Sequence, residues 1–302
     1  MGILPILIGW PLLIAAIVPL IKQERIRGYV VYAGAGGVMV LAAALLGMWL
    51  TNGAQAMAFY QETEWVNYLM IAGELFLTGL IVYLSIKYRK YPVILLSVGQ
   101  TALGIWTEFR FPMQPACHMQ IDSLSMLMCM IAAFIGGLIC IYAVGYMKAY
   151  HQHHKEFQDR SGFFFSMLFL FLAAMFGLVL SENLIWMYFF WEVTSVISFL
   201  LIGYTRTEEA VNNSFRALWM NLVGGFGFAI AIAVAAATLG TVQLEAVVQT
   251  GAVIPVALLA LAGLTKSAQL PFSSWLLGAM VAPTPSSALL HSATMVKAGV
   301  FL

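Results

Sequence analysis

The chain has 302 residues, of which 62% are hydrophobic and only 9% are Asp, Glu, Lys or Arg. A soluble domain carries about 25% charged residues, so this composition indicates an integral membrane protein rather than a soluble domain. The formal net charge of +1 gives no reason to expect a nucleic-acid partner. The three cysteines lack metal-ligand spacing, and their odd number argues against a disulfide framework.

Apolar runs of about 20 residues predict membrane-spanning helices. The first run is expected to be a retained helix rather than a signal peptide, because its positive charges follow the apolar residues. The ninth contains Pro271, which removes a backbone donor and clashes with the preceding turn, so this span is predicted to be broken. The expected fold class is therefore an all-α polytopic membrane helix bundle with about ten transmembrane helices, one of them broken. The predicted spans are 2–21, 29–50, 66–86, 92–107, 121–147, 162–180, 184–204, 210–239, 254–280 and 285–302.

Basic residues in the connections predict how the chain crosses the membrane. Four alternate connections, 22–28, 87–91, 148–161 and 205–209, hold ten lysines and arginines, whereas the opposite connections hold only Arg110. Cytoplasmic loops are enriched in lysine and arginine. These four connections are therefore expected to be cytoplasmic and the amino terminus to lie outside, in a multi-pass protein of a bacterial or archaeal inner membrane.

Charged residues inside the predicted spans are the strongest functional signal. Glu192, Lys266 and Lys297 lie in apolar stretches, where a charge at the bilayer centre costs about 2.5–3.5 kcal/mol. Such residues typically mark ion or proton pathways. The alternative for each is a structural one, in which a neighbouring helix pairs with the charge. Glu192 shares a helical face with Tyr188 and Ser195, which predicts a polar stripe.

Lys266 and His291 have the chemistry of proton carriers. Lys266 comes just before the predicted break, and broken helices at membrane depth line cavities or transport sites. A desolvated lysine changes its protonation state readily, and histidine is suited to relaying protons near neutral pH. On a regular helix His291 and Lys297 would point about 120° apart, so they are expected to join a lateral chain of groups rather than share one partner.

Other charged residues leave alternatives open. Arg216 either extends its charge to the headgroups or pairs with Glu192 on the adjacent helix. Glu74 lies in the middle of a span without an obvious partner. Asp122 begins a helix, where capping of the positive end of the dipole is as good an explanation as function. The histidines of 151–154 are expected to be a solvated loop rather than a metal site.

Two blocks of sequence resemble a known family. Residues 184–204 contain a Trp-Glu pair at Glu192, and residues 266–302 begin with Lys-Ser-Ala-Gln-Leu-Pro. Together they resemble the antiporter-like subunits of respiratory complex I, in particular those of the L type. This family includes Mrp-type cation/proton antiporters and membrane-bound energy-converting hydrogenases.

The resemblance extends over about 118–302. We therefore expect residues 1–117 to form N-terminal transmembrane helices that are less typical of the family. Residues 118–302 would form an antiporter-like module, the first half of an inverted-repeat fold. Because the chain ends within an apolar run and lacks the second repeat, it is expected to be a fragment of a longer protein.

The family resemblance also implies roles for particular residues. It makes Glu192 the start of a proton path, matched with a basic residue on the next helix. It makes Lys266 the central proton carrier on the broken helix, followed by two groups on the next helix. The segment around Asp122 resembles a helix start of the family. The implied path consists of Glu192, Arg216, Lys266, His291 and Lys297, with Asp122 and Glu74 as further candidates.

The function that follows is the translocation of protons, or of sodium, by one membrane subunit of a complex-I-like energy-converting oxidoreductase. Redox chemistry would take place in partner subunits, so no cofactor is expected in this chain. The expected partners are other membrane subunits and the lipid bilayer. One alternative is membership of a multisubunit Mrp-type antiporter. A different class of alternative is a non-conducting scaffold, against which the series Glu192, Lys266 and Lys297 argues.

Overall fold

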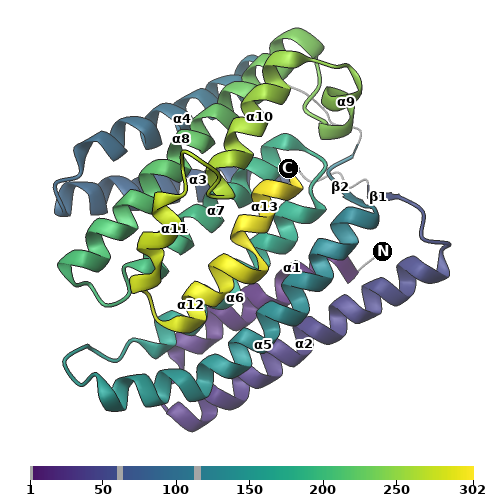
Figure 1. Ribbon diagram of the computed structural model, residues 1–302. Coiled ribbons are helices and arrows are strands. Elements are labelled where there is room, and N and C mark those ends of the chain that lie inside the picture. Colours follow the sequence, from purple (N-terminus) through teal and green to yellow (C-terminus); the bar gives the residue numbers. More distant parts are fainter. Residues whose placement is uncertain (1–2, 60–63, 112–116) are drawn as a thin grey trace.

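The structure, a computed structural model, describes residues 3–59, 64–111 and 117–302. The first predicted span begins at residue 2, which lies outside the described residues. Helices run side by side between two ends of the molecule (Figure 1). The elements are α1 (Ile3–Ile17), η1 (Val18–Leu20), α2 (Glu24–Thr51), β1 (Met57–Phe59), α3 (Glu64–Lys87), α4 (Tyr91–Arg110), β2 (Met119–Ile121), α5 (Ser123–His153), α6 (Ser161–Leu180), α7 (Leu184–Ile202), α8 (Glu208–Leu239), α9 (Leu244–Gln249), α10 (Val253–Lys266), α11 (Ser274–Gly278), η2 (Ala279–Val281), α12 (Thr284–Ala288), η3 (Leu289–Ala293) and α13 (Met295–Phe301).

Seven helices of the described part of the chain are long and apolar enough to cross a membrane. They are α1 with η1, α2, α3, α5, α6, α7 and α8. With the composition, they make the protein a multi-pass integral membrane protein with a helical fold. The shorter α10 is also apolar but has only 14 residues. The finer expectation of ten spans stays a prediction.

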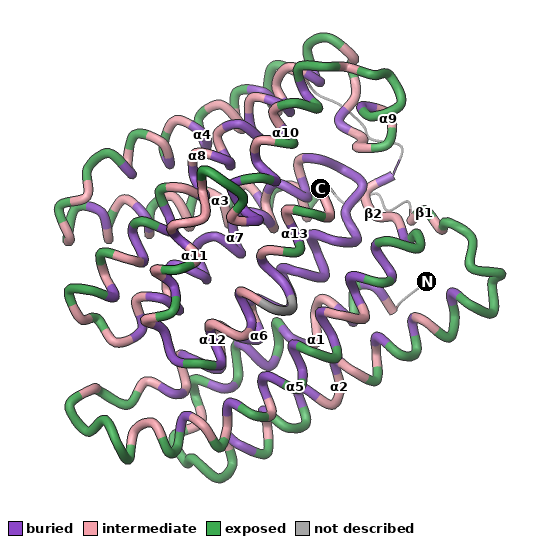
Figure 2. The backbone as a smooth tube through the Cα atoms, in the orientation of Figure 1, coloured by how far each residue is buried: buried purple, intermediate pink, exposed green. Residues whose placement is uncertain are grey.

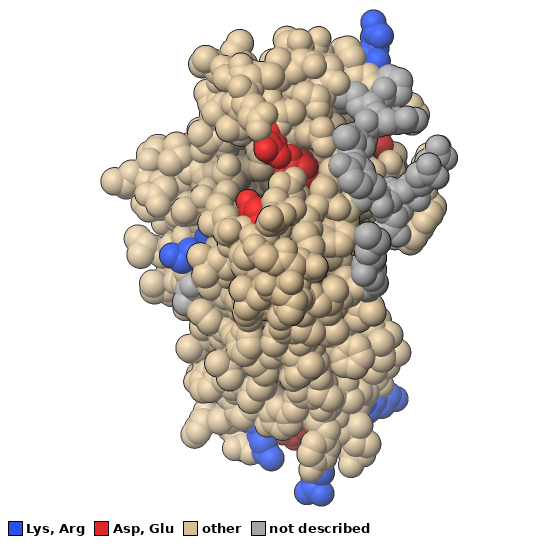
Figure 3. Space-filling view, turned by 90° about the vertical axis from the view of Figure 1, so that its right-hand side faces the viewer, with Lys and Arg blue, Asp and Glu red and all other residues tan. Residues whose placement is uncertain are grey.

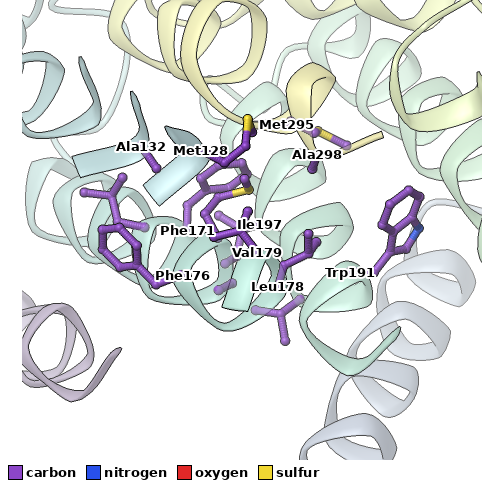
Figure 4. Packing of buried hydrophobic residues seen from close by; sticks show 14 of the residues in the cluster. Met128, Ala132, Phe171, Phe176, Leu178, Val179, Trp191, Ile197, Met295 and Ala298 are labelled. Carbon is purple, nitrogen blue, oxygen red and sulfur yellow. The ribbon is translucent and has the colours of Figure 1, made fainter. Parts of the chain in front are cut away.

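The core of the bundle is built around α6 and α7. In each of these helices 78% of the residues in the most apolar 18-residue stretch are buried, compared with 17% in α3. Figure 2 shows this contrast as buried backbone in the middle of the bundle and exposed backbone on the outer helices. Phe171 and Phe176 of α6 belong to the same apolar cluster as Ile197 of α7 and Met295 of α13 (Figure 4). Side chains on α7 are therefore held in place by the packing of α7 against α6 and the rest of the core.

The hairpin of α3 and α4 packs on the far side of this core from α2. α2 contacts α1 and α5, whereas α3 contacts α7 and α4 contacts α8. The chain therefore crosses the bundle after α2 and returns before α5. The two crossing segments pair as an antiparallel ribbon, with Met57 opposite Ile121 and Phe59 opposite Met119. Strands of three residues are too short to be predicted from the sequence.

Contacts between connections define the two ends of the bundle. At one end, β2 bridges to Ser181, and Asn183 bridges to Gln243. Figure 3 views this end, where charged side chains are sparse and acidic ones gather at a hollow. At the other end the four basic connections approach one another. Their contacts are Lys148 to Glu24, Lys90 to Asn212 and Arg160 to the carbonyl of Tyr204.

Local signals explain several helix starts. Asp122 caps α5: its Oδ1 accepts hydrogen bonds from the backbone N–H and the hydroxyl of Ser125, each at 2.7 Å. Asn183 caps α7 and Thr207 caps α8 in the same manner. α8 ends at Gly240, whose φ of 66° is the left-handed conformation that favours glycine.

The chain leaves the helical conformation between Lys266 and Ser274. α10 ends at Lys266, and α11 begins at Ser274. A carbonyl freed at the end of α10 is satisfied from α11, because the Nε1–H of the fully buried Trp275 donates to the carbonyl of Thr265 at 3.0 Å. The last segment is also irregular. The π-helical turn η3 separates α12 from α13, and the Thr294 hydroxyl donates back to the carbonyl of Leu289.

Candidate proton-transfer site

Lys266 is fully buried at the end of α10. Its Nζ donates to the carbonyl of Trp191 at 2.7 Å and to the hydroxyl of Ser195 at 2.8 Å. The same Nζ lies 4.5 Å from the centre of the Trp191 ring, a cation–π contact. All these contacts are with neutral groups. They can hold an ammonium in the apolar interior, yet none of them fixes its charge as a salt bridge would.

Glu192 occupies the same turn of α7, between Trp191 and Ser195. It is also buried, and its Oε2 accepts a hydrogen bond from Nε2 of Gln100 at 2.7 Å. Its Oε1 has no hydrogen-bond partner among the described residues. Glu192 and Lys266 interact electrostatically, but within the described part of the chain they form no ion pair within 4.0 Å. The two groups therefore influence each other through the field rather than by direct contact.

The expected pair of Glu192 with Arg216 is wrong. Arg216 is exposed, and no ion pair of its guanidinium occurs among the residues that the structure describes. The residue of α8 that faces Glu192 is Gly225, where a Cβ atom would overlap Glu192 Oε1 and lie 3.1 Å from Gln100 Oε1. Arg216 precedes Gly225 by nine residues, or about 180° around the helix, so it points away from the site.

Gln100 of α4 takes the place expected for a basic residue. Its position was not among the sequence candidates, because it lies outside the stretch of family resemblance and carries no charge. The signal that marks it is a polar stripe in an otherwise apolar helix. The buried polar residues of this stripe are Ser97, Gln100, Thr101 and Thr107, which recur at helical spacing.

His291 and Lys297 are differently placed. His291 lies in η3, half-buried, with a buried Nε2 that has no partner within the described residues, and its ring interacts with the backbone of Leu276. Lys297 is exposed on α13. Because η3 is a π-helical turn, the angle of about 120° expected between His291 and Lys297 on a regular helix does not apply. His291 thus faces the protein interior near α11, whereas Lys297 points out of the described bundle.

α13 nevertheless packs directly on the end of α10. A Cβ atom at Gly263 would lie 2.6 Å from the carbonyl oxygen of Gly299, so these two glycines allow the backbones to touch. Beside them the hydroxyl of Ser267 donates to the carbonyl of Val296 at 2.9 Å. The segment that carries His291 and Lys297 is therefore connected to the segment that carries Lys266.

Several buried polar atoms around Glu192 and Lys266 are unpartnered in the described part of the chain. Buried polar groups are normally hydrogen-bonded to protein or to water. A concentration of unpartnered atoms therefore marks a place suited to bound water and to protons in transit. These atoms are Tyr188 Oη, Trp191 Nε1, Glu192 Oε1, Gln100 Oε1 and Asn221 Oδ1.

The two further candidates, Asp122 and Glu74, differ in position: one caps a helix and the other lies within a helix. Asp122 is the cap of α5, at the end of the bundle where β2 lies. Glu74 lies on α3, half-buried, with an Oε1 that is buried and unpartnered among the described residues. The negative charge of Glu192 acts on Glu74 through the electric field, whereas Asp122 is accounted for by its capping box.

Two family models match the sequence. The model described as "NADH:quinone oxidoreductase/Mrp antiporter, TM" matches residues 181–302. The model described as "NADH-Ubiquinone oxidoreductase (complex I), chain 5 N-terminus" matches residues 106–157. The first match contains Glu192, Lys266 and the segment that follows, and the second contains the start of α5.

Curated relatives carry the names of antiporter subunits. The chain is 40% identical over 193 residues to the A/B subunit of a probable K⁺/H⁺ antiporter of Rhizobium meliloti (strain 1021), covering 61% of this chain and 18% of the relative. It is 41% identical over 191 residues to the A1 subunit of a Na⁺/H⁺ antiporter of Staphylococcus haemolyticus (strain JCSC1435), covering 60% of this chain and 23% of the relative. The chain thus spans about a fifth of the length of these relatives.

Solved structures support the fold and the family. The whole chain superposes on 52% of a chain in the membrane-bound sulfane sulfur reductase, an archaeal respiratory membrane complex, with a TM-score of 0.72 and 15% identity. This likeness concerns the fold alone. A chain of the Mrp complex from Dietzia sp. DQ12-45-1b matches 78% of this chain and 27% of its own length, with a TM-score of 0.54 and 28% identity. Over the matched segments, residues 106–157 and 181–302, the chain is therefore a member of the antiporter-like family of membrane subunits shared by complex I and the Mrp antiporters.

Proposed function

We propose that this chain translocates protons, with Lys266 as the group that takes up and releases them and Glu192 as the charge that controls its protonation. The observation that carries the proposal is the burial of Lys266, at the end of α10, against neutral groups of the α7 turn that also carries Glu192. A negative Glu192 favours the ammonium form of Lys266, whereas a neutral Glu192 favours the amine. A proton that reaches Glu192 therefore causes Lys266 to release one.

The geometry also supports a route beyond Lys266. We infer that α10 and α11 are the two halves of one broken membrane span, with Lys266 at the break. Backbone freed from a helix is tolerated at membrane depth where it lines a cavity or is buried in protein. The contact between Ser267 and Val296 brings the break next to the segment of His291, which is the next group able to accept the proton. Lys297, on the exposed face of α13, would take part only with a further segment or another protein packed against it.

Two assemblies fit this role. The relatives at about 40% identity are named as antiporter subunits, which favours a multisubunit cation/proton antiporter with other membrane subunits as partners. The second candidate is a complex-I-like oxidoreductase, in which partner subunits carry the redox chemistry and this chain carries protons or sodium. The basic end of the bundle would face the cytoplasm in either assembly, with the amino terminus outside.

Lys266→Arg tests the proposal. Arginine keeps the positive charge but stays protonated, so it removes proton release and keeps the charge. We expect proton transport by the full-length protein in its native assembly, measured in vesicles with a pH-sensitive dye, to fall by about 100-fold or more. The matched control is Lys148→Arg, the same change at an exposed lysine, which is expected to leave the rate unchanged.

Lys266→Ala separates transport from assembly. Alanine fits a helix end but carries no proton, so transport is expected to be lost while the subunits still co-purify. Transport at the parental rate in Lys266→Arg would show that Lys266 never releases its proton. A non-conducting scaffold role would then be the better account.

A further inference from the structure

The α3–α4 hairpin connects a second buried carboxylate to the Glu192 site. We propose that Glu74 exchanges protons with Glu192, so that this hairpin forms a side branch of the proton pathway. The proposal deepens the function proposed above and rests on it. The α3–α4 hairpin lies almost entirely before residues 106–157 and 181–302, the two segments that the family models match.

The hairpin is fixed against α7 and α8 by an apolar cluster of its own. Ile81 of α3 and Val93 of α4 pack with Phe199 of α7 and with residues of α8. On the same interface Gln100 donates to Glu192. The hairpin is therefore bound to the helix that carries Glu192 by packing and by a direct hydrogen bond to the carboxylate itself.

Glu74 faces this interface from α3. Its Oε1 is buried beside Gly104, where a Cβ atom would lie 3.5 Å away. Its carboxyl group interacts with the side chain of Thr101, which in turn is hydrogen-bonded to Thr78 at 2.7 Å. A purely structural glutamate would be satisfied by such hydroxyls. Glu74 instead keeps one oxygen unpartnered within the described residues, beside Gly104 of α4, one turn after Gln100.

Within the proposed branch, the hydroxyl of Tyr188 is the group that links the two carboxylates. Tyr188 is buried on α7, one turn before Glu192, and its hydroxyl has no hydrogen-bond partner among the described residues. It interacts electrostatically with both Glu192 and Glu74. A tyrosine hydroxyl can donate and accept at once, so it can connect two carboxyl groups directly or through water.

The two carboxylates also favour proton sharing on energetic grounds. Like charges that lie close together away from water repel strongly, so the pair is most stable with one negative charge between the two groups. In the transfer, the acid form of Glu74 gives its proton to the Tyr188 hydroxyl or a bound water, which gives one to the carboxylate of Glu192. One proton moves in one direction, and the negative charge moves to Glu74.

The branch leads toward one end of the bundle. The polar stripe of α4 runs from Ser97 through Gln100 and Thr101 to Thr107, next to Glu108 near the end of the helix. The negative charge of Glu108 acts on Glu74 through the electric field. The stripe therefore joins the middle of the bundle to the end that carries the β1–β2 ribbon.

The first test is transport by the full-length protein in its assembly. Glu74→Gln keeps the shape and the hydrogen-bonding oxygen but cannot carry a proton. We expect proton transport to fall by about tenfold or more, while Glu209→Gln, the same change at an exposed residue of α8, leaves it unchanged. Parental transport in Glu74→Gln would overturn the proposal.

The second test reads the carboxyl groups themselves. Infrared spectra recorded across a pH titration report the carbonyl band of each protonated glutamate. If Glu74 and Glu192 exchange a proton, the Glu192 band, assigned by its loss in Glu192→Gln, shifts its titration in Glu74→Gln. An unchanged Glu192 band would show that the two groups are independent and would overturn the inference. Failure of Lys266→Arg to block transport, by contrast, would count against the proposed function and not against this exchange alone.

Discussion

At the scale of single residues, the site combines a buried lysine with neutral partners. The carbonyl of Trp191 accepts hydrogen bonds from Lys266, Thr194 and Ser195, at 2.7, 2.8 and 3.0 Å. A direct salt bridge would stabilise the charged lysine and oppose release of its proton. Contacts with a carbonyl and a hydroxyl can be kept by an ammonium and, in part, by an amine. This arrangement suits a group that must alternate between the two forms.

Gly225 lies so close to Glu192 that a methyl group added at Gly225 is expected to affect proton transport. In Gly225→Ala the added Cβ would overlap Glu192 Oε1, and the flexible carboxylate would move away from Gln100. We expect proton transport to fall severalfold, with little loss of stability because alanine favours a helix. Gly227→Ala is the control on the same helix, since its Cβ would meet only ordinary contacts at 3.6 Å. Equal transport in both variants would show that the position of this carboxylate is unimportant.

The sequence identified the charges of the site but not all of their partners. Glu192 and Lys266 are conspicuous because a charge in an apolar run is expensive. Gln100 was missed, because an uncharged amide stands out only once the neighbouring helix is known. Arg216 was misassigned because being on the next helix says nothing about the direction in which a side chain points. That direction depends on which face of α8 packs against α7. Gly225 lies on the packed face, and Arg216 lies on the opposite one.

At the scale of elements, a buried indole ties the two sides of the break after Lys266 together. The Nε1–H of Trp275 satisfies the carbonyl of Thr265. Trp275→Phe keeps most of the packing but removes this hydrogen bond, so the carbonyl keeps only its bond from the backbone N–H of Ala268. We expect a loss of about 0.5–1.5 kcal/mol in the free energy of unfolding, observed as a lower thermal midpoint of the purified assembly. Trp219→Phe, at an exposed tryptophan of α8, should leave the midpoint within error; a matching drop there would mean that the indole hydrogen bond is irrelevant.

The end of the bundle that carries the ribbon contains a carboxyl group with an altered pKa. Burial raises the pKa of Glu182, and the negative charges of Glu245 and Asp122 raise it further against the opposing hydrogen bond from the backbone N–H of Glu245. A raised pKa in the folded state contributes stability that is fully present below the unfolded pKa of about 4.3. This contribution is lost as pH rises through the folded pKa.

Glu182→Gln is expected to remove this pH dependence. Glutamine can still accept the hydrogen bond from Glu245 but never becomes charged. The thermal midpoint of the variant should therefore rise relative to the parent as pH is raised from about 4 toward neutrality. The exposed Glu208→Gln is the control and should track the parent. A constant difference between Glu182→Gln and the parent over this range would contradict the assignment.

Irregular elements were the part of the fold that the sequence could not provide. Each long apolar run up to residue 239 coincides with a helix, because run length and composition fix that element. The ribbon of β1 and β2, the short α9 and the π-helical turn η3 depend on contacts between distant segments. No local pattern of three to six residues carries enough signal to predict them.

At the scale of the whole molecule, the chain divides into a covered core and a peripheral hairpin. α6 and α7 are enclosed by neighbouring helices, whereas α3 is largely exposed. Hydropathy predicted α3 as a span but not where it packs, because lipid and protein offer similar surroundings to an apolar face. Its contact with α7 is what connects Glu74 to Glu192.

The gathering of the basic connections at one end of the bundle predicts the orientation of the protein in the membrane. Loops rich in lysine and arginine remain on the cytoplasmic side, so Lys155 should be cytoplasmic and Gln55, near the β1–β2 ribbon, should be external. Both residues are exposed, and the three native cysteines are buried. In intact cells, a membrane-impermeant thiol reagent is therefore expected to label Gln55→Cys and not Lys155→Cys. After the cells are opened, both should react. Labelling of Lys155→Cys in intact cells would reverse the orientation, and the α4 stripe that ends near Glu108 would then lead to the cytoplasm instead of to the outside.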